Sequence, residues 1–395
     1  MLEEMIKQRH RFQTPTEEME RRWKVTLEAM EKEGLDALFF SAYDRWFHGV
    51  AKYLTDVLVW NYPNYYLFSK QGISGIGHGG WGTPGVLPFV AYRNFIDNVA
   101  VPSLPSTSYG YDWVPENLAE FIKKYDYKRI GICSSMCIPM PVYNYLTENL
   151  PGVEFIGFDD ALENIMAVKS EWEVDLHNKV VKLHEDIMAC VPSIVRPGRT
   201  EREVSRMLRS IADDLNCAEL NVLAFTTSMP GNLSYYYQNH VIQPDDYFSL
   251  LCEVSGPHGE WAELGRMYKL GDPPAGKIKQ VHSDVLKATD EIAKYLVPGA
   301  KCGDVFDKLN EILTGLGYPP ETRVCIHGQG YDIVQRPMIV AADNMILKEN
   351  MFLAIHPFLA CEEGQAFNCD NYWVKEGGAQ CINKSVSREI FNINY

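Results

Sequence analysis

The apolar positions of the first part of the chain fall into short runs that alternate with helical patterns. Residues 36–41 and 129–133 are compact apolar runs with the length of buried strands. Residues 115–125 instead carry apolar side chains at helical spacing. Alternating strands and helices of this kind predict a mixed α/β layer domain.

Three further segments complete the prediction for this part. Residues 14–17 (Thr-Pro-Thr-Glu) form the pattern of a capping box and predict a helix that stops at Gly34. Residues 53–69 are rich in aromatic and β-branched side chains and predict two strands joined by a turn. The glycine-dense residues 72–85 predict a loop.

A near-repeat organises the second half of the chain. Pro197-Gly198 and Pro298-Gly299 each separate two apolar patterns of helical period, because neither residue type continues a helix. Strand-like stretches follow at residues 220–227 and 323–327. Two matched helix–helix–strand halves predict a pseudo-two-fold α+β domain, with any site where the halves meet.

The boundary between the two parts is predicted near residue 163. Ser170 and Glu173 form a second capping box, which opens a helix expected to run to Ile194. We therefore expect an N-terminal α/β domain over residues 1–163 and a second domain over residues 164–395.

Bulk composition excludes several classes of function. A net charge of −15 disfavours binding to nucleic acid or to anionic membranes, which requires a basic face. No apolar run approaches the roughly 18 residues of a membrane span. The first residues lack the basic and apolar regions of a signal peptide, so we expect a cytoplasmic protein whose ten scattered cysteines are reduced.

Five segments, in this order, resemble the pita-bread family (M24), which includes methionine aminopeptidase, aminopeptidase P, prolidase and creatinase. They are residues 168–173, the two Pro-Gly corners, and residues 259–266, 327–330 and 351–357. The resemblance covers nearly the whole chain. It implies a C-terminal pita-bread domain, a curved antiparallel sheet covered by helices, behind a smaller α/β domain.

The metal-binding members of that family carry two Asp, one His and two Glu around two ions, a hard donor set suited to Mn, Co or Zn. Only the histidine is kept in this chain. The matching positions are Cys252 or, with a slip of one residue, Glu253, then Glu263, His327, His356 and Cys369. Exchanging carboxylates for imidazole and thiol removes the negative charge that holds two dications together. The resemblance therefore implies that the two-ion site is lost and that no metal cofactor is used.

A mononuclear metal site is the alternative for the same residues. Cysteine, glutamate and histidine are together a suitable zinc set. If Cys252, Glu263, His327, His356 and Cys369 converge, a zinc or manganese ion could be held there.

Creatinase is the family's metal-free member, and its chemistry implies roles for the same residues here. Glutamates hold a cationic substrate, which would fall to Glu263 and Glu253. A histidine near its ordinary pKa takes a proton from water and returns it to the leaving nitrogen. His327 and His356 would handle protons, and His240 is a further candidate base if its loop bends inward.

The resemblance also implies substrate-binding positions. Tyr62 falls where creatinase has part of its N-terminal carboxylate clamp, and Arg336 matches the second clamp arginine. Tyr235, Trp261 and Tyr331 could form an aromatic wall for a cation. Asp370, beside Cys369, completes the predicted set of binding residues.

The main hypothesis is a metal-independent, creatinase-like hydrolase that cleaves a C–N bond in a small guanidino, amide or betaine-like molecule. The alternatives are a metal-dependent Xaa-Pro dipeptidase with an altered site, a non-catalytic pita-bread binding module, and a lyase acting on a sulfonium or ammonium substrate. The resemblance to creatinase further implies a homodimer in which each N-terminal domain lends aromatic residues to the partner's cavity.

Overall fold

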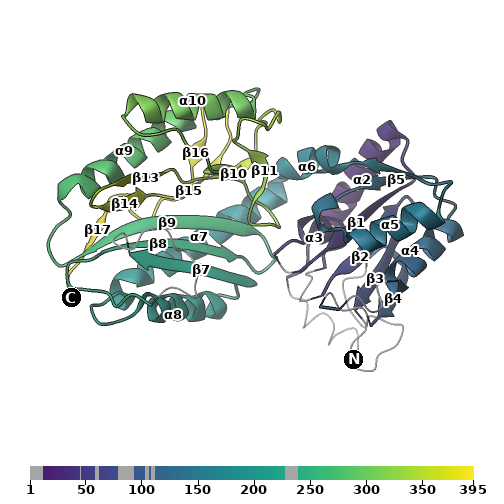
Figure 1. Cartoon of the computed structure of the whole chain (residues 1–395), viewed down its shortest axis with the longest axis horizontal. Coiled ribbons are helices and arrows are strands. Elements are labelled where there is room, and N and C mark those ends of the chain that lie inside the picture. The colour runs from purple at the N-terminus through teal and green to yellow at the C-terminus, as the bar shows by residue number, and fades with distance from the viewer. Residues whose placement is uncertain are drawn as a thin grey trace. The chain divides into compact units, whose positions relative to one another are not determined.

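The structure is a computed structural model that divides the chain into two units, Met1–Met166 and Ala167–Tyr395 (Figure 1). It describes residues 12–44, 46–57, 62–78, 93–102, 106–107, 112–226 and 239–395, with the backbone alone for 219–226. The predicted boundary after residue 163 lies inside helix α6 (Asp159–Ala167), near the end of the first unit.

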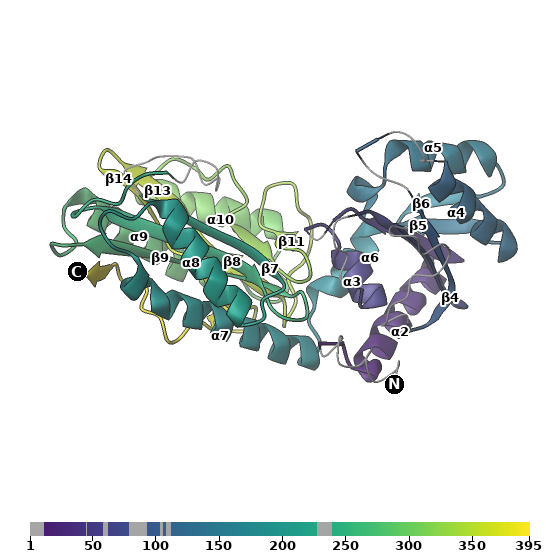
Figure 2. The same cartoon turned by 90° about the horizontal axis from the view of Figure 1, so that it is seen from below.

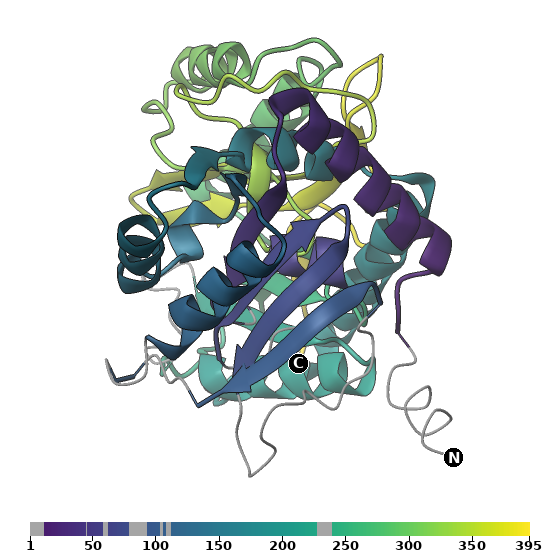
Figure 3. The ribbon, with the colours of Figure 1, turned by 90° about the vertical axis from the view of Figure 1, so that its right-hand side faces the viewer.

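The first unit is built on a six-stranded mixed sheet with the order β4-β3-β2-β1-β5-β6, whose strands lie side by side in Figure 3. Its strands are β1 (Ala37–Ala42), β2 (Asn64–Ser69), β3 (Gly72–His78), β4 (Phe95–Val101), β5 (Arg129–Ile132) and β6 (Glu154–Gly157). Its other helices are α2 (Thr16–Glu33), α3 (Gly49–Thr55), α4 (Trp113–Lys124), the short η1 (Ser135–Cys137) and α5 (Met140–Asn149). The predicted α/β layer is confirmed.

Two predicted elements of this unit are wrong. Residues 72–78 form strand β3 instead of a loop. A Cβ at Gly75 would lie 2.7 Å from the ring of Phe95 on the neighbouring strand, so glycine is used here for close packing and not for a turn. Residues 53–55 end helix α3, where the buried Tyr53 ring packs against the Arg22 guanidinium.

The predicted capping box at the start of α2 is also wrong, although the helix itself and its end are confirmed. The Thr14 hydroxyl donates to Asp56 Oδ1 at 2.6 Å, and the N-cap position falls on Pro15. A tertiary hydrogen bond has therefore replaced the local one. The helix ends at Gly34, whose φ of +63° lies in the left-handed region that glycine adopts readily.

The second unit contains two helix pairs and two larger sheets, as the Pro-Gly repeat predicts, together with a two-stranded hairpin. The first half comprises α7 (Glu171–Ile194), α8 (Glu201–Asp214), β7 (Glu219–Thr226), β8 (Tyr247–Ser255) and β9 (Trp261–Leu270). The second comprises α9 (Gly276–Ala293), α10 (Cys302–Gly315), β10 (Ile326–Gly328), β11 (Gln335–Met338), β12 (Phe352–Ile355), β13 (Phe358–Cys361), β14 (Gly364–Phe367), β15 (Asp370–Trp373), β16 (Gln380–Cys381) and β17 (Phe391–Ile393). The strands assemble as β17-β9-β8-β7 and β11-β10-β12-β15-β16, beside the hairpin β13-β14. The pita-bread arrangement expected from the sequence is present, with α7 and α8 over one face of β7–β9 (Figure 2).

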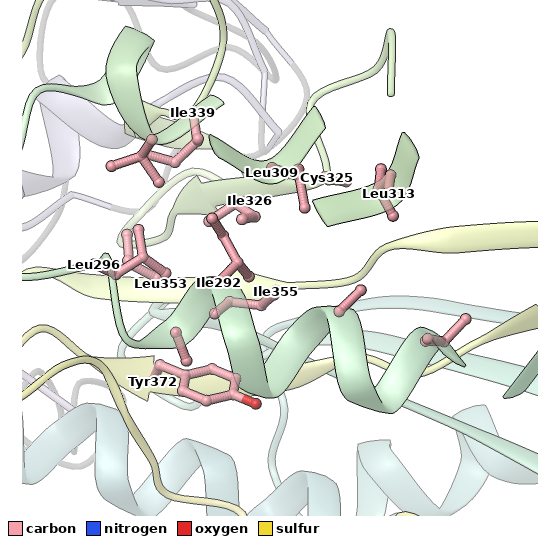
Figure 4. Close-up of a cluster of buried hydrophobic side chains, with 14 of the residues drawn as sticks. Ile292, Leu296, Leu309, Leu313, Cys325, Ile326, Ile339, Leu353, Ile355 and Tyr372 are labelled. Atoms are coloured by element: carbon pink, nitrogen blue, oxygen red, sulfur yellow. The ribbon is translucent and has the colours of Figure 1, made fainter. Parts of the chain in front are cut away.

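Each half has its own apolar core, and the two sheets touch where β9 meets β15. The helices α7 and α8 cover Val254 and Leu264, while α9 and α10 cover Ile326, Leu353 and Ile355 (Figure 4). Gly265 and Cys369 form an antiparallel bridge at the junction, with N–O distances of 3.0 and 3.2 Å. This bridge brings chain segments about a hundred residues apart into register.

The cysteines and the helices bear on the class of protein. None of the ten cysteines, all of which lie in described residues, forms a disulfide. Among the described residues, no helix has the length and apolar character needed to cross a membrane.

The contact at the junction predicts a stability effect. A Cβ at Gly265 would overlap the Phe367 ring and lie 2.8 Å from Cβ of Cys369. We expect Gly265→Ala to lower the free energy of unfolding by about 1–3 kcal/mol, because overpacking of this kind forces side chains off their rotamers. Urea denaturation measures the change. Gly152→Ala is the control, since nothing lies within 4 Å of its added Cβ, and equal midpoints for the two variants would contradict the expectation.

Candidate active site

Strand register brings three of the predicted catalytic residues together. On β10 and β12, His327 lies directly opposite Ala354, so His356, two residues further on, is its diagonal neighbour on the same face. Glu263 lies on β9, two residues before the Gly265 bridge to Cys369. The site therefore forms where the two sheets meet, as the pseudo-symmetry predicts.

The three side chains make direct contact. The Nε2 atoms of His327 and His356 are 3.1 Å apart. Oε1 of Glu263 lies 3.5 Å from His327 Nε2, and its Oε2 lies 3.8 Å from His356 Nε2. Their ligand-type atoms all lie within 4.8 Å of one another. Glu263 and His327 are buried, whereas the His356 side chain is 15% exposed and gives the cluster its access to solvent.

A backbone contact orients the His327 ring. Its Nδ1 lies 3.0 Å from the carbonyl oxygen of Gly328, which can only accept a hydrogen bond. Nδ1 therefore carries the proton, and the lone pair of Nε2 points toward Glu263 and His356. This is how proteins fix the tautomer of a histidine that serves as a base or a ligand.

Three polar residues hold Glu263, and two of them, Gln329 and Asn371, were not assigned a role from the sequence. Gln329 Nε2 donates to Glu263 Oε1 at 3.0 Å, and Asn371 Nδ2 donates to the Glu263 backbone oxygen at 2.6 Å. The Cys369 thiol lies 3.7 Å from Glu263 Oε2. Gln329 could have been found from its position, because it stands two residues after His327, just beyond the end of β10, and residues two apart in an extended chain share a face. The Asn371 contact depends on how the sheets meet, which no sequence pattern reports.

The register of β8 and β9 decides between the two candidates for the first ligand position. Glu253 pairs directly with Glu263, so the two side chains share one face of the sheet. Cys252 pairs with Leu264 and packs with it in the core beneath α7 and α8. Cys252 is thus on the wrong face for the predicted metal set, and Glu253 takes its place.

Burial sets the protonation of the cluster. It lowers the pKa of His327 to about 4 and that of His356 well below its ordinary value, to which the nearby His327 adds. It also raises the pKa of Glu253 to about 8. The pKa of Glu263 is raised well above its usual range, first by burial and then by the neighbouring charge of Glu253. Without a cation, the site at neutral pH therefore holds neutral imidazoles and protonated carboxyls.

Comparison with known proteins places the chain in a family. The sequence profile of metallopeptidase family M24 matches residues 175–385, more than half of the chain. The chain belongs to metallopeptidase family M24.

Individual relatives of this M24 chain are distant. It is 23% identical over 245 residues to the probable dipeptidase PepE of Mycobacterium bovis, covering 58% of this chain and 64% of that protein. It is 23% identical over 251 residues to an Xaa-Pro dipeptidase of Pyrococcus horikoshii, covering 61% and 69%. The crystal structure of an X-Pro aminopeptidase from Thermotoga maritima superposes with a TM-score of 0.80 at 18% identity, covering 94% and 99%. At that identity the superposition establishes the shared fold.

The donor set of this M24 chain does not suit a pair of divalent ions. Of the five positions that the resemblance assigns to ligands, the described site has carboxyls at Glu253 and Glu263 alone. His356 and Cys369 stand where the family's glutamates are expected, and both border Glu263. Two dications a few ångströms apart need more negative charge than two carboxylates supply.

The structure places His240 outside the cluster. Its Nε2 lies 2.8 Å from Asp246 Oδ2, at the opposite end of β8 from Glu253. At about 3.3 Å per residue, the strand separates the two sites by roughly 20 Å. The described position of His240 gives no support to the predicted catalytic role, which stays a prediction.

Two predicted binding residues have internal partners. Asp370 is fully buried, with Oδ1 2.6 Å from Arg266 Nη2 and Oδ2 3.1 Å from Arg388 Nε. Both of its carboxylate oxygens are thus paired inside the protein, and its substrate contact stays a prediction. Arg336 forms a two-point ion pair with Asp343, at 2.6 and 3.3 Å. Its role as a substrate clamp stays a prediction.

The aromatic wall stays a prediction in part. Trp261 and Tyr331 are both buried. Trp261 lies on β9, the strand that carries Glu263, and its backbone N–H donates to the oxygen of Gly330, next to Tyr331, at 2.7 Å. Tyr62 belongs to the first unit and is 37% exposed. Tyr235 lies outside the described residues.

The raised pKa of Glu253 predicts a pH-dependent stability in metal-stripped protein. Between pH 4.5 and about 8 the folded chain keeps a proton on Glu253 that the unfolded chain has lost, so the free energy of unfolding falls as pH rises. The lowered pKa of His327 acts in the opposite sense, but only below its ordinary value of 6.5. Between pH 6.5 and 8, therefore, the change in the free energy of unfolding with pH reports on the carboxyls and not on His327.

In that window we expect Glu253→Gln to flatten the pH slope by up to about 1.4 kcal/mol per pH unit, the value for one proton. Denaturation at half-unit pH steps measures this slope. Slopes that coincide for the variant and the wild-type protein would show that Glu253 titrates normally.

Proposed function

We propose that this chain is a hydrolase that cleaves the peptide C–N bond of small dipeptides, as a divergent relative of the Xaa-Pro dipeptidases. The observation that carries the proposal is the convergence of Glu263, His327 and His356 in a chain of family M24. The M24 relatives named dipeptidase and Xaa-Pro dipeptidase support this substrate class. A non-catalytic binding module would have no need of buried acid–base groups that converge.

Hydrolysis adds the oxygen of water to the carbonyl carbon, breaks the C–N bond and moves a proton to the leaving nitrogen. Glu253 is suited to carry that proton. It lies on the same face as Glu263, one strand away, and burial raises its pKa to about 8. At neutral pH the protonated Glu253 carboxyl can give its proton to the leaving nitrogen, and the carboxylate that remains can take a proton from the attacking water. The acid–base role thus replaces the clamp expected for Glu253 from the sequence.

His327 and His356 place two imidazole rings beside the Glu263 carboxyl, where the substrate would react. Both imidazoles are neutral at neutral pH because burial lowers their pKa values. Their Nε2 atoms face Glu263, and the partly exposed His356 marks the side from which substrate would enter. The homodimer implied by the resemblance remains a prediction, to be checked by light scattering.

Metal-independent hydrolysis of a small nitrogenous compound is the second candidate. The observation that favours it is the direct 3.1 Å contact between the two imidazoles, which can pass a proton between them without an ion. This candidate keeps the C–N bond chemistry but predicts activity that survives chelation.

Substitution at Glu253 tests the proposed chemistry. We expect Glu253→Gln to lower kcat by about 10²–10⁴-fold, the usual contribution of a general acid–base group, while His240→Ala retains wild-type kcat. Release of free amino acid from dipeptides measures both. Equal losses in the two variants would remove Glu253 from the reaction.

A substrate panel tests the substrate class. We expect turnover of Xaa-Pro or other dipeptides and none of creatine, because Arg336 is paired with Asp343 and cannot clamp a carboxylate without breaking that pair. Mass spectrometry of mixed substrates reads all products at once. Turnover restricted to guanidino or betaine compounds would overturn the dipeptidase proposal and favour the second candidate.

A further inference from the structure

The buried charge of the site sets how many ions it can hold. Four family carboxylates would balance the four positive charges of two dications. Glu253 and Glu263 are the two carboxyls on the described face, and they balance one dication. Because an uncompensated charge in a dry site costs several kcal/mol, the surviving carboxyls favour a single divalent ion.

The spacing of the donor atoms matches one ion. Zinc ligands at about 2.0–2.2 Å in tetrahedral arrangement stand roughly 3.3–3.6 Å apart. The two imidazole Nε2 atoms are 3.1 Å apart, and the Glu263 carboxylate faces both of them, with Oε1 3.5 Å from His327 Nε2 and Oε2 3.8 Å from His356 Nε2. One ligand atom from each residue lies within 4.8 Å of the other two, which suits a single ion. The Nδ1 hydrogen bond of His327 to Gly328 presents its Nε2 lone pair to the same point.

We propose that Glu263, His327 and His356 form a mononuclear site for a dication of the zinc class, in place of the family's two-ion centre. Imidazole nitrogen and one carboxylate are donors that zinc prefers, whereas manganese prefers a set dominated by oxygen. Three protein ligands leave a fourth position open beside the partly exposed His356, as in catalytic zinc sites. When bound, such an ion lowers the pKa of its water and polarises a carbonyl oxygen.

Cys369 and Gln329 act as the outer shell of this site. The Cys369 thiol and the Gln329 amide contact the two different oxygens of Glu263, at 3.7 and 3.0 Å. Each fixes the carboxylate orientation from a separate strand segment. Outer-shell partners of this kind change metal affinity by about 10–100-fold when they are removed. Cys369 is thereby a positioning residue, and its thiol does not need to bind the ion.

The inference deepens the proposed hydrolase function and is tested apart from activity. Full-length protein is stripped with a chelator, dialysed against equal zinc and manganese, desalted and analysed for metal. We expect about one zinc per chain and a zinc-dependent rise in Tm, since the ion binds the folded state alone. Two ions per chain, or selective manganese uptake, would overturn the proposal.

Matched variants locate the ion. We expect His356→Ala to abolish the zinc-dependent rise in Tm, and His240→Ala to keep it. Cys369→Ala should weaken zinc binding by about 10–100-fold, while Cys252→Ala, an equally buried thiol on the other face of β8, should leave it unchanged. If His356→Ala fails to fold, the number of zinc ions bound per wild-type chain still tests the proposal.

The two proposals fail separately. Absence of zinc uptake by a protein that cleaves dipeptides would end the zinc proposal and leave the hydrolase function in place. One bound zinc per chain in a protein that cleaves no dipeptide would support the zinc site and end the proposed dipeptidase function. Zinc uptake that is equal in the wild type and in His356→Ala would show that the ion binds elsewhere, which also overturns the site.

Discussion

The contact between the buried Glu263 carboxyl and the two imidazoles is the interaction on which the rest of the site depends. Burial makes the charged form of each partner costly, so the carboxyl holds its proton and the histidines stay neutral until a cation enters. A buried carboxyl of this kind, once it loses its proton, binds a cation strongly because no water shields its charge. The number of such carboxyls then limits how much positive charge the cavity accepts.

The fold creates this contact through register and not through local sequence. Glu263 comes from the sheet of the first half, and His327 and His356 come from the sheet of the second half. The two sheets meet through the Gly265–Cys369 bridge, which is possible because residue 265 has no side chain. The outer contacts of Glu263 from Gln329, Cys369 and Asn371 all come from the second half as well. The relative position of the catalytic candidates therefore depends on this junction.

Much of the architecture could be predicted from the sequence, because long periodic helices and Pro-Gly corners are local signals. The capping box of Ser170 and the end of α2 at Gly34 are of this kind. The errors arose where tertiary contacts override local preference. Thr14 bonds Asp56 instead of capping α2, and Gly75 permits the approach of a ring in a strand.

The candidate site shows the same division. His327, His356 and Glu263 follow from motifs, because each stands at a fixed place in a recognisable segment. The choice between Cys252 and Glu253 could not be made from spacing, since a shift of one residue in β8 exchanges the two faces of the sheet. The position of His240 could not be predicted either, because its partner Asp246 lies at the far end of β8 from Glu253.

The most direct test of the account is the anomalous scattering of crystals grown with zinc and measured at the zinc absorption edge. The account predicts one anomalous peak per chain, within bonding distance of Glu263, His327 and His356, with the Cys369 sulfur still beside Glu263. Two peaks bridged by Glu253 and Glu263 would contradict it. A site with no peak, in crystals of protein that cleaves dipeptides, would contradict it equally.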